Sequence, residues 1–169
     1  MEHMTAPEPD RVDEILAQWS VERPDLDVSP VGVIGRLHRI AERLRDELVA
    51  LYREYGLGEG EFDVLATLRR TGAPYELAPG ELAAHTMVTT GAVSKRLDRL
   101  EALGYVQRRS SDRDGRGRVV GLTAAGVAAI DEAFAAHVRN EARLLEGLDP
   151  EQRAQMIALL RVWMRALDG

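Results

Sequence analysis

Residues 89–122 read TTGAVSKRLDRLEALGYVQRRSSDRDGRGRVVGL, and this stretch decides the fold. Val93, Leu97 and Leu100 recur at helical spacing, so they predict a helix over residues 89–103 with one apolar face turned inward. The opposite face carries small polar side chains and a lysine, and a glycine follows the last turn and ends the helix. The pattern therefore indicates a helix with one buried face and one face free to approach another molecule.

The second half of the same stretch predicts a β-hairpin. Residues 105–109 and 118–122 have the alternating pattern of strands, and the loop at 110–117 is polar and contains glycine and arginine. The hairpin therefore has a basic tip.

A short helix precedes this stretch. It begins at Pro79 without a side-chain cap, because Ala78 occupies the N-cap position and cannot accept a backbone hydrogen bond. A helix around Phe62, Leu65 and Leu68 comes before it. A short helix, a turn, a second helix and a basic hairpin are the parts of a winged helix-turn-helix. The predicted fold class is thus mainly α, and the second helix would enter the major groove of double-stranded DNA while the hairpin reaches the backbone or the minor groove.

The candidate DNA-binding residues lie on the exposed face of the second helix and in the hairpin. Lys95 is the expected reader of guanine. The full set is Thr89, Thr90, Gly91, Ala92, Ser94, Lys95, Arg96, Arg99, Arg113, Arg116 and Arg118.

Long amphipathic helices flank the predicted DNA-binding domain at residues 57–122. We expect N-terminal helices over residues 10–56, C-terminal helices over residues 123–169, and a disordered or vector-derived tail at residues 1–9. Because the apolar faces of the outer helices need a partner, they predict a dimerisation region. A homodimer would place two reading helices on the halves of a pseudo-palindromic operator.

Charge is spread unevenly along the 169 residues. The formal net charge is −6, but residues 85–118 carry eight cations against four acids, a local charge of +4. The other 14 cations and 24 acids leave −10 on the remaining chain. A basic region on an acidic body suits one DNA-binding surface and opposes indiscriminate coating of nucleic acid, although a solvated basic loop would give the same pattern.

Several classes of function are excluded or disfavoured by composition. The chain has no cysteine, which excludes disulfides, thiolate metal sites and cysteine nucleophiles. No apolar run is long enough for a membrane span, and we expect a cytoplasmic protein without membrane contact. His38, His85 and His137 are far apart in sequence, so no metal site is predicted. Paired acids occur without a neighbouring base, so we expect neither an enzyme nor a cofactor.

The segment Asp114-Gly115-Arg116-Gly117-Arg118-Val119-Val120-Gly121-Leu122-Thr123-Ala124-Ala125-Gly126 resembles the wing signature of the MarR family, D-x-R-x-x-x-V-x-L-T-x-x-G. Residues 96–108 are similar to the family's exit from the recognition helix. The resemblance implies a homodimeric transcriptional regulator in which Asp114 braces the wing and Arg116 reaches DNA. Gly115 stands where many relatives have a second arginine, which weakens the implied grip of the wing.

A narrower resemblance concerns a ligand. An additional N-terminal helix with Trp19, together with Asp63, Arg96 and Arg108, is similar to the urate-responsive subfamily, which uses these four positions for its ligand. The chemistry is coherent, because an indole can stack on a planar ring and a guanidinium can pair with an anion. Asp63 would repel the anion or move when it enters. The resemblance implies a repressor that a small anion such as urate releases from DNA.

Three alternatives remain open. The same regulator could respond to a polycarboxylate such as trans-aconitate, or to no ligand. The helices could instead form a protein-interaction module without specific DNA binding, in which Trp19 is a core contact and Asp63 only favours a helix start.

Overall fold

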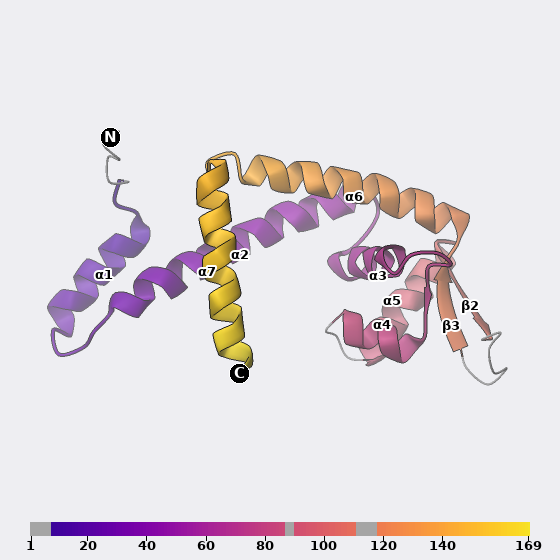
Figure 1. Cartoon of the computed structure of the whole chain (residues 1–169), viewed down its shortest axis with the longest axis horizontal. Helices are drawn as coiled ribbons and strands as arrows, with labels where there is room; N and C mark the ends of the chain where they lie inside the picture. Colours follow the sequence, from indigo (N-terminus) through magenta and orange to yellow (C-terminus); the bar gives the residue numbers. More distant parts are fainter. Residues whose placement is uncertain (1–7, 87–89, 111–117) are drawn as a thin grey trace. The chain divides into compact units, whose positions relative to one another are not determined.

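The computed structural model describes residues 8–86, 90–110 and 118–169. The described chain forms seven helices and three strands and divides into two units, residues up to Glu47 and residues from Leu48 onward. The mainly helical winged-helix fold confirms the predicted fold class (Figure 1). No helix in the described ranges is both long and apolar enough to cross a lipid bilayer.

The N-terminal unit holds α1 (Arg11–Glu22) and most of α2 (Ser29–Glu54). Asp10 caps α1, and its carboxylate also accepts hydrogen bonds from Arg36 of α2 at 2.8 and 3.0 Å. Val12 is buried against α2, where a Cβ on Gly35 would stand 3.4 Å from it. The two helices are therefore joined by a small apolar contact and an ion pair.

The second unit is built on α3 (Glu59–Arg70), α4 (Pro79–His85) and α5 (Thr90–Ala102). Their inward side chains form one apolar core together with the sheet and α6. Ala78 is the N-cap of α4 and makes no side-chain cap, as predicted. Glu81 compensates by accepting a hydrogen bond from the Ala78 N–H at 2.9 Å.

The sheet is antiparallel, and β3 is its central strand. Its order is β1 (Glu76–Leu77), β3 (Arg118–Leu122), β2 (Val106–Ser110). Val106 pairs with Leu122 at one end of the hairpin, and Ser110 pairs with Arg118 at the other. The short strand β1 and the predicted hairpin therefore belong to one sheet, which fixes the base of the wing.

The long helix α6 (Ala124–Leu144) is attached to the hairpin by two residues at its start. The Thr123 hydroxyl accepts from the Gly126 N–H at 3.0 Å and donates to the Gly104 carbonyl at 2.7 Å. Gly126 touches the backbone of Tyr105 so closely that an added Cβ would overlap the Tyr105 carbonyl oxygen and stand 2.8 Å from its carbon. These contacts give the threonine and glycine of the wing segment a packing role.

The last helix, α7 (Pro150–Asp168), begins at a capping box formed by Asp149 and Gln152. None of its residues is buried, and Leu159 and Leu167 are each more than 70% exposed. Phe134 and Val138 on α6 are also exposed, so part of the apolar surface that was predicted to need a partner is uncovered in the described part of the chain.

One predicted detail differs from the structure. Asp63 was expected at the start of its helix, but α3 begins at Glu59 after Gly58, so Asp63 lies in the second turn. Ser29 is the first residue of α2, and Asp27 accepts a hydrogen bond from its N–H at 3.0 Å. The predicted domain boundaries at residues 56 and 122 remain predictions.

Candidate nucleic-acid interface and an adjoining pocket

The orientation of α5 is set by its buried face. Val93, Leu97 and Leu100 are at most 2% exposed, so the opposite face of the helix points to solvent. Ser94 and Lys95, which are predicted to approach base edges, and Arg99 are exposed on that outer side, and their DNA contacts remain predictions. Thr90, Gly91 and Ala92 lie in the first turn of α5, and Thr89 lies outside the described residues.

The base of the wing is positioned by an ion pair across β3. Arg109 on β2 donates to both carboxylate oxygens of Glu76 on β1, at 2.9 and 2.6 Å. The intervening Gly121 permits this, because its Cβ would lie 2.7 Å from Glu76 Cγ. Arg118 is exposed at the start of β3, in line with its predicted role. The predicted wing residues Arg113, Asp114 and Arg116 lie outside the described residues.

Arg108 ties the wing to the recognition helix. Its guanidinium donates to Asp98 at 2.6 Å, to Glu101 at 2.8 Å and to the Ser94 carbonyl at 3.2 Å, all on α5. It does not line the pocket described next. The structure thus places Arg108 as a link between β2 and α5, and its predicted ligand contact remains a prediction.

A pocket of about 400 Å³ lies next to the recognition helix α5. We call it the Asp63 pocket. Its walls come from the C-terminal end of α2, from α3, from the residue after α4 and from α5, through Tyr52, Glu59, Phe62, Asp63, Thr86 and Arg96. Two of the four predicted ligand residues, Asp63 and Arg96, are therefore brought together, although 33 positions separate them in sequence.

Neither charged residue is neutralised by a close partner. Within the described ranges, neither Asp63 nor Arg96 makes a hydrogen bond or an ion pair, although Arg96 lowers the pKa of the Asp63 carboxyl. Burial raises the pKa of the Asp63 carboxyl, Arg70 and Arg96 oppose this rise, and Glu59 adds to it. Both the guanidinium and the carboxyl group can therefore form hydrogen bonds with a ligand in the pocket.

The fourth predicted ligand residue, Trp19, belongs to the N-terminal unit. It lies on α1 and is 50% exposed. Its indole is available for a contact beyond α1.

Sequence reasoning missed the aromatic wall of the pocket. The rings of Tyr52 and Phe62 stack with centroids 4.0 Å apart, and the Tyr52 hydroxyl lies 3.1 Å from His137 Nδ1 on α6. Burial, together with nearby carboxylates, raises the pKa of Tyr52 to about 12, so its hydroxyl stays protonated at neutral pH. No pattern pointed to Tyr52, because its place on the α2 stripe is indistinguishable from that of a core residue.

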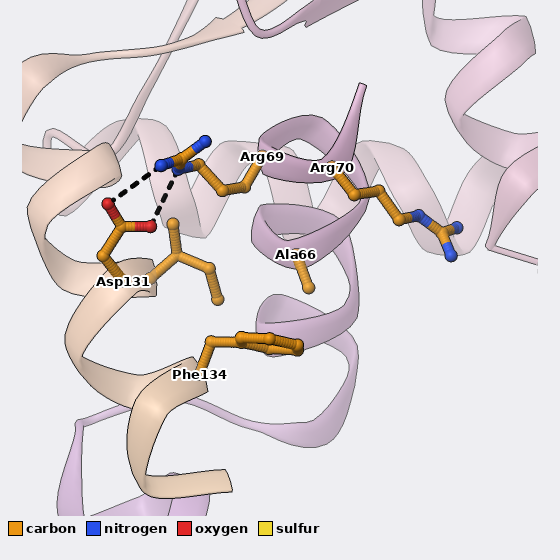
Figure 2. A pocket seen from close by; sticks show the side chains of 6 residues that line it. Ala66, Arg69, Arg70, Asp131 and Phe134 are labelled. Carbon is orange, nitrogen blue, oxygen red and sulfur yellow. Dashed lines mark hydrogen bonds and ion pairs between the residues drawn. The ribbon is translucent and has the colours of Figure 1, made fainter. Parts of the chain in front are cut away.

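A second cavity, of about 450 Å³, lies between α3 and α6 (Figure 2). Its apolar side is formed by Ala66, Ile130 and Phe134. Arg69 and Asp131 close one end through a pair of hydrogen bonds at 2.7 and 3.2 Å, and Arg70 points the other way. Arg69 and Asp131 therefore neutralise each other at this joint between α3 and α6.

The chain has a short helix, then a helix with one buried face, then an antiparallel hairpin with an exposed arginine. This arrangement defines a winged-helix DNA-binding protein. A model of the MarR family matches residues 55–117. The chain is 40% identical over 149 residues to the HTH-type transcriptional regulator PecS of Dickeya dadantii. The aligned region covers 88% of this chain and 90% of that protein. The chain belongs to the MarR family; it is a DNA-binding transcriptional regulator and not an enzyme.

Two further similarities agree with this assignment. The chain is 36% identical over 128 residues to the HTH-type transcriptional repressor Rv2887 of Mycobacterium tuberculosis, covering 75% of this chain and 88% of that protein. The fold matches the crystal structure of Sco3205, a MarR family regulator from Streptomyces coelicolor in complex with DNA. That match has a TM-score of 0.75 and 24% identity, and it covers 85% of this chain and 91% of that chain.

Proposed function

We propose that the protein is a homodimeric repressor that binds a pseudo-palindromic operator and is released by a small planar anion such as urate. The observation that carries the ligand part is the Asp63 pocket, in which Asp63 and Arg96 face one cavity without a close partner for either charge. The repressor part is supported by the similarity to a mycobacterial protein named as a repressor.

The ligand chemistry follows from the three walls of the pocket. Arg96 can donate two hydrogen bonds to an anionic oxygen or nitrogen, and Asp63 can accept from a ring N–H beside it. The stacked rings of Tyr52 and Phe62 supply a flat apolar side. Urate combines all three features, since it is planar, anionic and carries ring N–H groups.

The placement of Arg96 supports a coupling between ligand and DNA. Arg96 is on α5, whose other face carries the base-approaching Ser94 and Lys95, whereas Asp63 is on α3. A ligand that bridges the two side chains stabilises one arrangement of α5 relative to α3. If that arrangement binds the operator less well, ligand and DNA must oppose each other by the same free energy.

The dimer is supported by the apolar side chains that α7 leaves exposed. Met156, Leu160 and Leu167 follow one another at helical spacing, and each is at least 38% exposed. A contiguous apolar face of this kind is uncommon on a monomeric protein and typical of a subunit interface.

The test is a fluorescence-anisotropy titration of the protein on its own upstream intergenic DNA, with unlabelled competitor, repeated with urate, xanthine and trans-aconitate. We expect specific binding that weakens steeply with salt and that urate abolishes. Specific binding that ignores urate but responds to trans-aconitate would replace the ligand class with polycarboxylates. Specific binding indifferent to every ligand would contradict the effector proposal, and the absence of specific binding would favour the protein-interaction alternative.

The role of Asp63 predicts a pH dependence. Because the carboxyl must be ionised to accept a ring N–H and its pKa is raised, the affinity for urate should fall as the pH drops through that pKa. Asp63→Asn should remove this component of the pH profile, measured by isothermal titration calorimetry between pH 5 and 8. An unchanged profile in the variant would show that Asp63 does not touch the ligand.

A further inference from the structure

The Arg96 side chain packs on the first turn of α3 at a glycine, where no side chain is in its way. Gly60 is the second residue of α3, and the Arg96 guanidinium of α5 lies directly over it. A Cβ built on Gly60 would overlap Arg96 Nε and Cζ and would stand 2.7 Å from Nη2. The contact is therefore possible only when residue 60 is glycine.

No directional contact fixes the end of the Arg96 side chain. Within the described ranges, Arg96 makes no hydrogen bond or ion pair. Its guanidinium packs on the bare backbone at Gly60 and lies near enough to Asp63, one turn further along α3, to lower the pKa of that carboxyl. The contact with Gly60 and the attraction of Asp63 thus both act on the Arg96 guanidinium.

The glycine has no local reason to be there. Glycine is a poorer helix former than alanine, and Gly60 does not have the left-handed backbone conformation that would require a glycine. Gly80 is the matching case, because it is also the second residue of a helix, α4, and a Cβ there would meet nothing within 4 Å. The two positions differ in what lies over them.

We propose that Gly60 is the positioning residue that seats the Arg96 guanidinium at the Asp63 pocket, so that the recognition helix and α3 present their two charged groups to one ligand. The proposal on the effector rests on the function proposed above, whereas the seating of Arg96 does not. A side chain at residue 60 would displace the flexible end of Arg96 rather than the helix backbone, so the fold would survive the change.

The first experiment needs no ligand. Arg96 lowers the pKa of Asp63, so any change that moves the guanidinium away should raise that pKa further. We would follow the Asp63 carboxyl by carbon-detected NMR titration in the parent protein, Gly60→Ala, Arg96→Ala, the double variant and Gly80→Ala. We expect Gly60→Ala to raise the pKa in the direction of Arg96→Ala, and Gly80→Ala to leave it at the parent value.

The double variant separates seating from a general structural effect. If Gly60 acts only through Arg96, the pKa of Asp63 in Gly60→Ala/Arg96→Ala should equal that in Arg96→Ala alone. An unchanged pKa in Gly60→Ala, or additive shifts in the double variant, would overturn the proposal. Thermal unfolding of Gly60→Ala and Gly80→Ala checks that both remain folded, and both should melt at or above the parent temperature.

The second experiment measures urate binding by calorimetry with the same variants. Gly60→Ala should weaken binding by about tenfold, as expected for the loss of a charge-assisted hydrogen bond, and should add nothing in the Arg96→Ala background. Parent-level affinity in Gly60→Ala would overturn the effector half of the proposal. If the parent protein itself fails to bind urate, the proposed function fails while the NMR titration still decides the seating of Arg96.

Discussion

The helices α5 and α7 have similar apolar stripes, but the stripe of α5 is buried and the stripe of α7 is exposed. The stripe of α5 is fully covered within its own chain, by α3, α4 and β2, whereas α7 has no buried residue. The stripe of α5 therefore holds its unit together, whereas the stripe of α7 stays exposed within the part of the chain that the structure describes. Amphipathic spacing by itself does not distinguish a helix that builds a core from one that builds an interface.

The largest effect is expected from breaking the covered stripe. Leu100 is completely buried on α5, so Leu100→Ala should lower the free energy of unfolding by about 2–5 kcal/mol and weaken operator binding with it. Urea denaturation followed by circular dichroism measures the first effect. A loss below about 1 kcal/mol would mean that the core tolerates a cavity at this position.

The attachment of α6 to the wing should be the next most sensitive feature. In Gly126→Ala the new methyl group meets the Tyr105 backbone, which cannot move aside as a side chain can, so we expect a loss of about 1–3 kcal/mol. Gly147→Ala is the matched control, because a Cβ there meets nothing within 4 Å. Equal melting temperatures for the two variants would refute the close contact.

Breaking the open stripe should affect assembly rather than folding. Leu160→Glu places a charge on the apolar face of α7 and should raise the dimer dissociation constant by at least about tenfold, or about 1.4 kcal/mol, in sedimentation velocity. Ala158→Glu adds the same charge on the opposite side of the helix and should leave assembly unchanged. A parent that sediments as a monomer would contradict the dimer altogether.

The smallest effect is expected at the joint between α3 and α6. Arg69 and Asp131 are 37% and 50% exposed, so their ion pair is screened by solvent and Asp131→Asn should cost no more than about 1 kcal/mol. Chemical denaturation at low and high salt should show this small difference shrinking with salt. A larger, salt-independent loss would assign the joint a packing role beyond its charges.

Local patterns in the sequence predicted most of the elements. Gly104 adopts a left-handed backbone conformation with φ of 74°, as expected for the residue that ends α5. The cap at Asp10, the uncapped start at Ala78 and the hairpin register are likewise consequences of near neighbours. Such features depend on interactions within a few residues, which is why they can be read without the fold.

The pocket could be predicted only in part. Asp63 and Arg96 were found through resemblance to a family, but nothing local indicated that Tyr52 and Phe62 would stack beside them or that Arg96 would rest on Gly60. The fold also pairs Arg108 with Asp98 and Glu101, which no local pattern indicated, and the ligand contact implied for it by the resemblance remains a prediction. Side-chain pairing depends on which residues meet across elements, and spacing along the chain does not reveal that.

The sequence by itself determined the class of the protein, because helix periodicity, turn residues and the wing segment are short-range signals that agree with one another. The tertiary structure decided which charges were neutralised and which were left uncommitted. It paired Arg109 with Glu76 across a glycine and Arg108 with α5, and it left Asp63 and Arg96 facing one cavity. Which charged side chains pair is a long-range property, because it depends on how α3, α5 and the hairpin pack around a shared core.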